Sequence, residues 1–203
     1  MNSNNAAGVV AFLQEAGHLR HVPRTGWALG GVADPESVAE HSYGTAVIAY
    51  VVALCEGANP ERAAALAVFH DLPETRIGDV PSVGKPYVQT ASAARVITDQ
   101  TAGLPDDIAT AIRRLVVEFE DRSTVEAQCA KDADRLDCLL RARVEQARGH
   151  QNLQPWVDTM VAGMQTPTGK RLASAAAEVP VNEWWRSFAE SYGRTGPRAV
   201  VGP

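Results

Sequence analysis

The chain has 203 residues, of which 45% are hydrophobic and 21% charged, and its formal net charge is −5. This length suits one domain with a full core, and the acidic balance excludes a general nucleic-acid-binding protein, which would present a basic face. No stretch approaches about 18 uncharged apolar residues and the N-terminus lacks a signal-peptide pattern, so we expect neither a membrane partner nor secretion.

Helical periodicity dominates the first third of the chain. Residues 6–19 carry apolar side chains at helical spacing, whereas residues 20–36 contain Pro and Gly and are expected to form a loop. Ser37 and Glu40 then form a capping-box pattern at the start of a nearly all-apolar run, which predicts a buried central helix to about residue 56.

The same periodicity continues to residue 192. Asn59-Pro60 predicts a helix start, with the helix running on to Pro73, and residues 78–86 form a Gly/Pro loop. A second capping-box pattern at residues 123–126 predicts a long helix to about residue 148. Further helices are expected at 87–102, 105–119, 155–163, 167–178 and 181–192.

Strand signals are almost absent, so we predict an all-α protein. We expect residues 1–203 to form a single domain, with a core of about residues 10–150 and a helical extension over 151–192. Residues 193–203 are expected to be a flexible tail. Three cysteines at unrelated spacings favour buried thiols in a reducing compartment, and we expect a cytoplasmic protein.

Three residues on two of these helices suggest a metal site. His41 lies one turn into the predicted central helix, and His70-Asp71 ends the next one. An ionised Asp71 after the apolar run AAALAVF needs a partner, a proton or a metal. Imidazoles and carboxylates are ligands of borderline divalent cations. Alternatively, His41 is a core histidine and His70 a charged helix terminus, but each of these alternatives explains one residue at a time.

A fourth ligand is expected from the segment KDADRLD, which offers Asp132, Asp134 and Asp137. The apolar stripe of this helix lies nearer to Asp137 and Asp132, so periodicity ranks Asp134 last. Asp134 nevertheless lies on the same helix face as several small residues, against which another helix could pack. A solvated acidic face paired with neighbouring arginines is the alternative for at least one of the three.

Several motifs together resemble a known family. HDLPETRIGD is preceded by VPRTGW and PESVAEH and followed by KDAD. In this order, over about residues 10–148, they resemble the HD-domain phosphohydrolases, in particular the 5′-deoxynucleotidase branch. The resemblance implies a helical bundle with a metal site between central helices. It implies the ligands His41, His70, Asp71 and Asp134, and thus selects Asp134 among the three aspartates.

The resemblance also implies roles around the metal. Glu74 matches the catalytic carboxylate, which orients or deprotonates the attacking water. Asp79 matches an acidic residue that serves the sugar hydroxyl or a proton relay. Trp27 matches a tryptophan that presses on the sugar and disfavours a ribose 2′-OH.

One position departs from the family pattern. The bacterial members carry an arginine directly before this tryptophan, whereas this chain has Gly26. Arg24 is the best substitute for the phosphate-binding cation, and Lys85 is another candidate.

These residues predict metal-dependent hydrolysis of (deoxy)nucleoside 5′-monophosphates to nucleoside and phosphate. The two imidazoles favour Mn²⁺, Co²⁺, Fe²⁺ or Ni²⁺ over Mg²⁺. One ion is expected, because His18, His21 and His150 do not have the spacing of dinuclear members. The resemblance further implies a homodimer, and we expect no nucleic-acid polymer as partner.

Three other readings stay open. The same scaffold could act on a nucleoside di- or triphosphate or on another phosphorylated metabolite. It could be a di-iron oxidative member, which would bind two metal ions. A non-catalytic adaptor with a structural metal is the third reading, against which the Glu74 and Asp79 pair argues.

Overall fold

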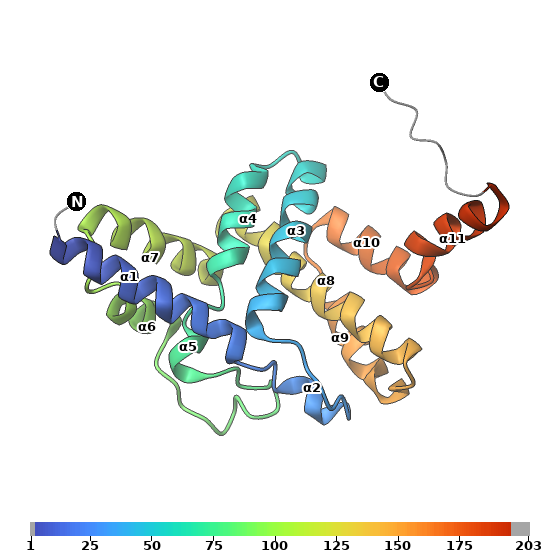
Figure 1. Ribbon diagram of the computed structural model, residues 1–203, viewed down its shortest axis with the longest axis horizontal. Coiled ribbons are helices and arrows are strands. Elements are labelled where there is room, and N and C mark those ends of the chain that lie inside the picture. Colours follow the sequence, from blue (N-terminus) through green and yellow to red (C-terminus); the bar gives the residue numbers. More distant parts are fainter. Residues whose placement is uncertain (1–2, 196–203) are drawn as a thin grey trace.

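The computed structural model describes residues 3–195, and Figure 1 shows their arrangement. Every regular element within this range is a helix, with one isolated antiparallel bridge between Pro23 and Ser37. The all-α prediction is therefore confirmed. Of the tail predicted over 193–203, residues 193–195 belong to the last helix, and the remainder lies outside the described residues.

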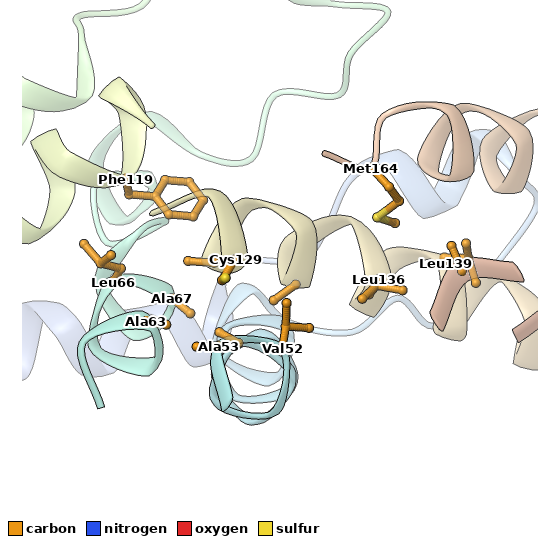
Figure 2. Close-up of a cluster of buried hydrophobic side chains, with 14 of the residues drawn as sticks. Val52, Ala53, Ala63, Leu66, Ala67, Phe119, Cys129, Leu136, Leu139 and Met164 are labelled. Carbon is orange, nitrogen blue, oxygen red and sulfur yellow. The ribbon is translucent and has the colours of Figure 1, made fainter. Parts of the chain in front are cut away.

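Three helices form the centre of the molecule, namely α3 (Val38–Glu56), α4 (Pro60–Phe69) and α8 (Val125–Ala147), and each packs against the other two. Their contact is made of small and branched apolar side chains without solvent exposure, which suits close helix packing. Figure 2 shows this cluster, which includes Val52, Ala53, Ala63, Leu66, Cys129 and Leu136.

The caps explain where these helices begin. The predicted capping box of α3 is present, because Ser37 accepts from the Glu40 N–H and the Glu40 side chain accepts from the Ser37 N–H. The second predicted capping box is wrong. Thr124 caps α8 instead of Ser123. The Glu126 side chain accepts a hydrogen bond from the Asn59 backbone N–H at 2.9 Å, so it contacts the start of α4 and does not cap its own helix.

The chain between α4 and α8 differs from the prediction at two places. Helix α4 ends at Phe69 rather than near Pro73, and a separate single turn, α5 (Glu74–Ile77), follows. The helix predicted over 87–102 is only α6 (Ala93–Gln100), because Ser92 caps it with its side chain. Helix α7 (Asp106–Asp121) matches the expectation.

The N-terminal segment packs beside this region. Helix α1 (Ser3–Gly17) continues into a 3₁₀ turn, His18–His21. The loop predicted over residues 20–36 contains one short helix, α2 (Gly26–Leu29).

Helices after residue 150 complete the core. Both α9 (Gln154–Ala162) and α10 (Pro167–Glu178) pack on α8, and buried side chains such as Leu153 and Met164 join the central cluster. The last helix, α11 (Glu183–Thr195), projects from the bundle (Figure 1). It exposes a row of aromatic side chains, Trp184, Trp185, Phe188 and Tyr192.

Helix α3 is apolar on both faces. By length and composition it is the one helix in the described part of the chain that could cross a membrane, a test that the core helix of a soluble protein also passes. Its inner face packs on α4 and α8. Its outer face leaves five large side chains exposed, Tyr43, Val47, Tyr50, Val51 and Leu54. The neighbouring Cys55 is exposed as well, contrary to the expectation that all three thiols are buried.

Candidate metal centre and active site

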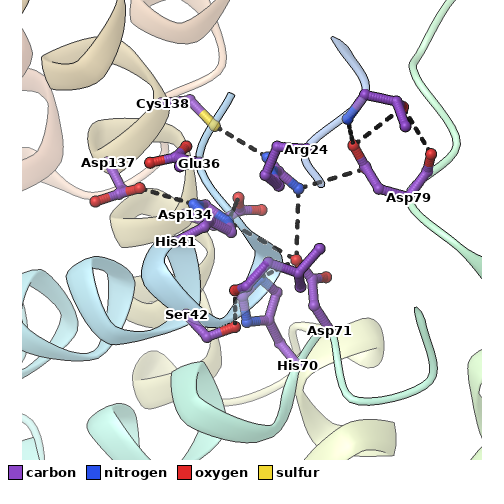
Figure 3. Close-up of polar contacts among 12 residues, drawn as sticks. Arg24, Glu36, His41, Ser42, His70, Asp71, Asp79, Asp134, Asp137 and Cys138 are labelled. Atoms are coloured by element: carbon purple, nitrogen blue, oxygen red, sulfur yellow. Dashed lines mark hydrogen bonds and ion pairs between the residues drawn. The ribbon is translucent and has the colours of Figure 1, made fainter. Parts of the chain in front are cut away.

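His41 lies at the centre of a buried polar cluster between α3 and α8 (Figure 3). It sits in the second turn of α3, on the face that packs against α8, and it is fully buried. Its Nε2 atom lies 3.2 Å from Asp134 Oδ1 and 3.8 Å from Asp71 Oδ2. Carboxylates from two different segments therefore converge on one imidazole nitrogen.

The end of α4 supplies the second imidazole. His70 is the C-cap residue of α4, and its Nδ1–H donates to the Ala67 carbonyl at 2.6 Å. Since a carbonyl oxygen only accepts, this bond keeps the proton on Nδ1 and leaves the Nε2 lone pair free. That Nε2 atom lies 3.0 Å from Asp71 Oδ2.

The cluster fits a divalent metal ion. The Nε2 atoms of His41 and His70 are both buried and lack a hydrogen-bond partner within residues 3–195. A buried polar atom without a partner costs free energy, and this cost disappears when the atom coordinates a cation. Ligand atoms of His41, His70 and Asp71 lie within 4.8 Å of one another, as donors to one ion must.

The electrostatics of the cluster also suit a cation. Burial raises the pKa of Asp71, but His70, His41 and Arg24 outweigh burial and lower it to about 2. Burial likewise opposes ionisation of Asp134, yet Lys131 and the two histidines hold the pKa of this carboxyl well below its usual value. Both carboxyl groups are therefore ionised at neutral pH.

The three aspartates of α8, Asp132, Asp134 and Asp137, make different contacts. Asp134 faces Nε2 of His41, as the family resemblance implied and periodicity did not. Asp132 is fully buried and accepts from the backbone N–H groups of Gln165 and Thr166, so it anchors the start of α10. The solvated-face alternative thus fails for Asp132.

Asp137 is a site residue that sequence reasoning weighed but did not select. Its Oδ2 atom lies 2.7 Å from Nδ1 of His41, on the ring edge away from Asp134 (Figure 3). Gly44 makes room for this contact, because a Cβ atom there would lie 2.1 Å from Asp137 Oδ1. Burial lowers the pKa of His41, but Asp134 and Asp137 outweigh burial and raise it well above its usual value.

Arg24 joins the cluster from the loop before α2. Its Nη1 atom lies 3.5 Å from Asp71 and 3.6 Å from Asp79, and its Nη2 donates to Cys138 Sγ at 3.3 Å. Thr25 holds the other side of Asp79 through its backbone N–H at 2.6 Å. The PRTGW loop and the residue after Gly78 are therefore tied together beside the candidate metal ligands.

The structure explains why this chain has glycine before Trp27. A Cβ atom on Gly26 would lie 2.8 Å from the Trp156 ring, so a larger side chain meets that indole. The guanidinium that lies beside Asp71 and Asp79 belongs to Arg24, two residues earlier. Lys85 does not join the cluster, because it is exposed in the turn after α5 and makes no ion pair with a described site residue.

Glu74 begins α5, three residues after Asp71. Burial, followed by the charges of Asp71 and Asp79, raises the pKa of Glu74 to about 9. Its Oε2 atom is buried and lacks a hydrogen-bond partner in the described part of the chain. A carboxyl group in this state holds a proton at neutral pH, which is a property of acid–base catalysts.

Trp27 is a core residue in this structure. Only 2% of it is exposed, and its ring packs against Trp156 at a centroid distance of 5.0 Å. Its Nε1–H donates to Glu36 Oε1 at 3.0 Å. Carboxylate oxygens of Glu36 and Asp137 and a ring nitrogen of His41 lie within 4.8 Å of one another, so Trp27 is linked to the cluster through Glu36. Sequence reasoning missed Glu36, although it lies in the PESVAEH motif.

Comparison with known proteins shows the family of this chain. The HD domain family model matches residues 16–176, so the chain belongs to the HD-domain family. It is related to the 5′-deoxynucleotidase HDDC2 of Mus musculus, with 31% identity over 195 residues, which cover 87% of this chain and 96% of the relative. The chain is accordingly an HD-domain phosphohydrolase related to proteins named 5′-deoxynucleotidase.

Two solved structures share the fold. A conserved hypothetical protein from Pyrococcus furiosus is 26% identical, with a TM-score of 0.63 over 91% of this chain and 99% of the other. A protein from Magnetospirillum magnetotacticum, described as a predicted metal-dependent phosphohydrolase, is 22% identical with a TM-score of 0.62 over 94% of each chain. At this identity it shows the fold alone. The family match extends beyond the resemblance found at residues 10–148 and includes α9 and most of α10.

Proposed function

We propose that this protein hydrolyses deoxynucleoside 5′-monophosphates to nucleoside and phosphate, with one divalent metal ion held by His41, His70, Asp71 and Asp134. The observation that carries the proposal is a pair of buried Nε2 atoms, from His41 and His70, that have no hydrogen-bond partner among residues 3–195. They face two ionised carboxylates, with Arg24 beside them. The relatives named 5′-deoxynucleotidase support the nucleotide class.

The metal supplies charge neutralisation and Lewis-acid activation at the phosphate. Imidazole donors favour Mn²⁺, Co²⁺, Fe²⁺ or Ni²⁺ over Mg²⁺. His70 presents Nε2 because Ala67 fixes the proton on Nδ1, and Asp137 does the same for His41. The chain thus orients both imidazoles before any ligand arrives.

Arg24 binds the phosphate in this proposal. A phosphate monoester dianion resists attack by water until its charge is neutralised. The guanidinium of Arg24 already lies between Asp71 and Asp79, and it can donate to phosphate oxygens with several N–H groups. Burial opposes its charge, but Cys138, Asp71 and Asp79 raise the pKa of Arg24 above its usual value, so it stays cationic. Lys85 is exposed and is a weaker candidate.

Glu74 moves the protons. Water attacks phosphorus, the bond to O5′ breaks, one water proton passes to O5′ and the other stays on the phosphate product. The protonated Glu74 carboxyl, whose Oε2 has no partner among the described residues, donates its proton to O5′ and takes one proton from the attacking water in return. Asp79, which accepts a hydrogen bond from the Thr25 N–H, accepts another from a sugar hydroxyl or relays a proton.

Trp27 is proposed to set the preference for deoxyribose. The support is its hydrogen bond to Glu36, which connects the indole to the His41 side of the cluster. Trp27→Phe keeps a large ring and removes that bond, so we expect ribonucleotide hydrolysis to rise relative to deoxyribonucleotide hydrolysis, by about fivefold for about 1 kcal/mol. Trp185→Phe, on exposed α11, is the matched control. An unchanged ratio of ribonucleotide to deoxyribonucleotide hydrolysis would show that Trp27 does not select the sugar.

A phosphatase panel tests the proposed activity. Deoxyribo- and ribonucleoside monophosphates, diphosphates and triphosphates are assayed with Mn²⁺, Co²⁺ or Mg²⁺, beside His70→Ala. We expect phosphate release from deoxynucleoside monophosphates with Mn²⁺ or Co²⁺, and none from the variant. Release from di- or triphosphates alone, or from no nucleotide, would contradict the proposal.

We also propose that the protein is a homodimer in the cytoplasm and that the chain acts as a single HD domain. The exposed outer face of α3 supports the dimer, because the chain has no Asp, Glu, Lys or Arg between Glu40 and Glu56. A second copy presents the same uncharged stripe across a twofold axis. Light scattering should give a dimer that Val51→Asp converts to a monomer. A monomeric native protein would contradict this.

A further inference from the structure

The turn of α8 that carries Cys138 reaches the candidate metal centre. Cys138 follows Asp134 by four residues, so both side chains lie on the same face of α8. The Sγ atom of Cys138, a ring nitrogen of His41 and a carboxylate oxygen of Asp134 all lie within 4.8 Å of one another. Figure 3 shows the sulfur at the edge of the cluster, on the side of Arg24.

The thiol is available as a donor. Cys138 is buried and forms no disulfide, and its sulfur accepts a hydrogen bond from Arg24 at 3.3 Å. The neighbouring His41 is fully buried, and its Nε2 atom lacks a hydrogen-bond partner within the described range. An unpartnered imidazole nitrogen beside a thiol and a carboxylate is a donor set for a cation rather than for a neutral ligand.

The spacing suits one shared ion. Two donors on the same ion lie no farther apart than the sum of their bond lengths, roughly 4.4 Å for nitrogen and sulfur bonded to zinc. The donors of His41, Asp134 and Cys138 lie within 4.8 Å of one another, so they would move closer together on binding one ion. Cys129, also buried on α8, belongs to the apolar core cluster instead.

We infer that Cys138 is a sulfur donor of the metal centre and that it biases the site toward thiophilic divalent cations such as Co²⁺, Zn²⁺ and Cd²⁺. On binding, the S–H bond breaks, a metal–sulfur bond forms and the proton leaves to solvent. A thiolate binds these ions more strongly than Mn²⁺ or Mg²⁺, which favour oxygen donors. The inference rests on the metal centre of the proposed function.

Cobalt absorption tests this bond directly. Metal-free full-length protein is titrated with Co²⁺, and its near-ultraviolet and visible spectra are recorded. We expect a sulfur-to-cobalt charge-transfer band together with the visible cobalt bands. Cys138→Ser and Cys138→Ala should lose the charge-transfer band, and Cys129→Ser should retain it. Visible cobalt bands without a charge-transfer band in the native protein would overturn the inference, and that spectrum needs no variant.

Metal selectivity provides a second readout. Cys138→Ser should weaken Cd²⁺ binding by on the order of tenfold and leave Mn²⁺ binding nearly unchanged, as measured by competition with a metal indicator. An equal loss for both ions would mean that Cys138 only positions Arg24. Nucleotide hydrolysis is measured in the same samples. Active cobalt protein without the charge-transfer band defeats this inference alone, whereas protein that binds no cobalt defeats the metal centre as well.

Discussion

Asp137 and His41 are joined by a 2.7 Å contact between Oδ2 and Nδ1, on the opposite side of the imidazole from Asp134. A carboxylate in this place accepts a hydrogen bond from Nδ1–H, which keeps the proton on Nδ1 and leaves Nε2 for a cation. Asp137 therefore acts on the metal centre through His41, without facing the centre itself.

Asp137→Asn should weaken metal binding by about 10- to 100-fold, because an amide holds the imidazole in this tautomer less well than a carboxylate. Calorimetric titration of the metal-free protein with Mn²⁺ measures the affinity. Glu120→Gln, an exposed acidic change on α7, serves as the control and should bind normally. Equal affinity of Asp137→Asn and the native protein would show that this contact does not orient His41.

Glu74→Gln should lower kcat by about 10²- to 10⁴-fold, because glutamine keeps the shape of the side chain and cannot exchange a proton. Metal affinity should change little, since Glu74 is not among the proposed ligands. Steady-state phosphate release and a metal titration on the same preparation separate the two effects. Glu61→Gln, exposed on α4, is the matched control. If Glu74→Gln hydrolyses nucleotide at the native rate, Glu74 does not carry the proton.

Gly26→Ala should destabilise the fold by about 1–3 kcal/mol, because the new methyl group would lie 2.8 Å from the Trp156 ring. Chemical denaturation measures the free energy of unfolding. Gly17→Ala is the matched control, since a Cβ atom there meets nothing within 4 Å and the backbone is already helical. We expect it to be neutral or stabilising. A stable Gly26→Ala would remove the proposed reason for glycine at this position.

Glu15 makes the attachment of α5 sensitive to acid. Hydrogen bonds from Arg76 lower the pKa of Glu15 below its ordinary value of 4.5, and Gln100 adds to this effect against burial. A carboxyl with a lowered folded-state pKa stabilises the fold above pH 4.5, and the stabilisation is lost as the pH falls through the lowered value.

Glu15→Gln should therefore lower the Tm at pH 7, and the difference from the native protein should shrink as the pH falls below 4.5. Thermal denaturation followed by circular dichroism from pH 7 to pH 3 measures both curves. A difference in Tm that is the same at every pH would mean that ionised Glu15 does not stabilise the fold.

The sequence predicts helices well where the signal is local. The cap formed by Ser37 and the start at Asn59-Pro60 depend on neighbouring residues, and both are found. One failure has a tertiary cause and the other a local cap as its cause. Glu126 binds the start of α4 instead of capping its own helix, and the predicted helix over 87–102 begins only after the Ser92 cap.

The candidate site shows the same division. His41, His70 and Asp71 stand out as polar residues in apolar helices, and the structure brings them together. Asp134 required the family motif, because its helical face is not the most apolar one. Asp137 and Cys138 could not be assigned from the sequence, since their partners lie about 100 residues away along the chain.

Metal titration of catalysis tests the central claim most directly. Protein freed of metal with a chelator is titrated with Mn²⁺, and phosphate release from a deoxynucleoside monophosphate is measured beside the amount of bound metal. We expect no release without metal, and a linear rise that reaches its plateau at a single bound ion per chain. Full activity after chelation, or a plateau that requires two ions, would contradict the metal centre proposed for His41, His70, Asp71 and Asp134.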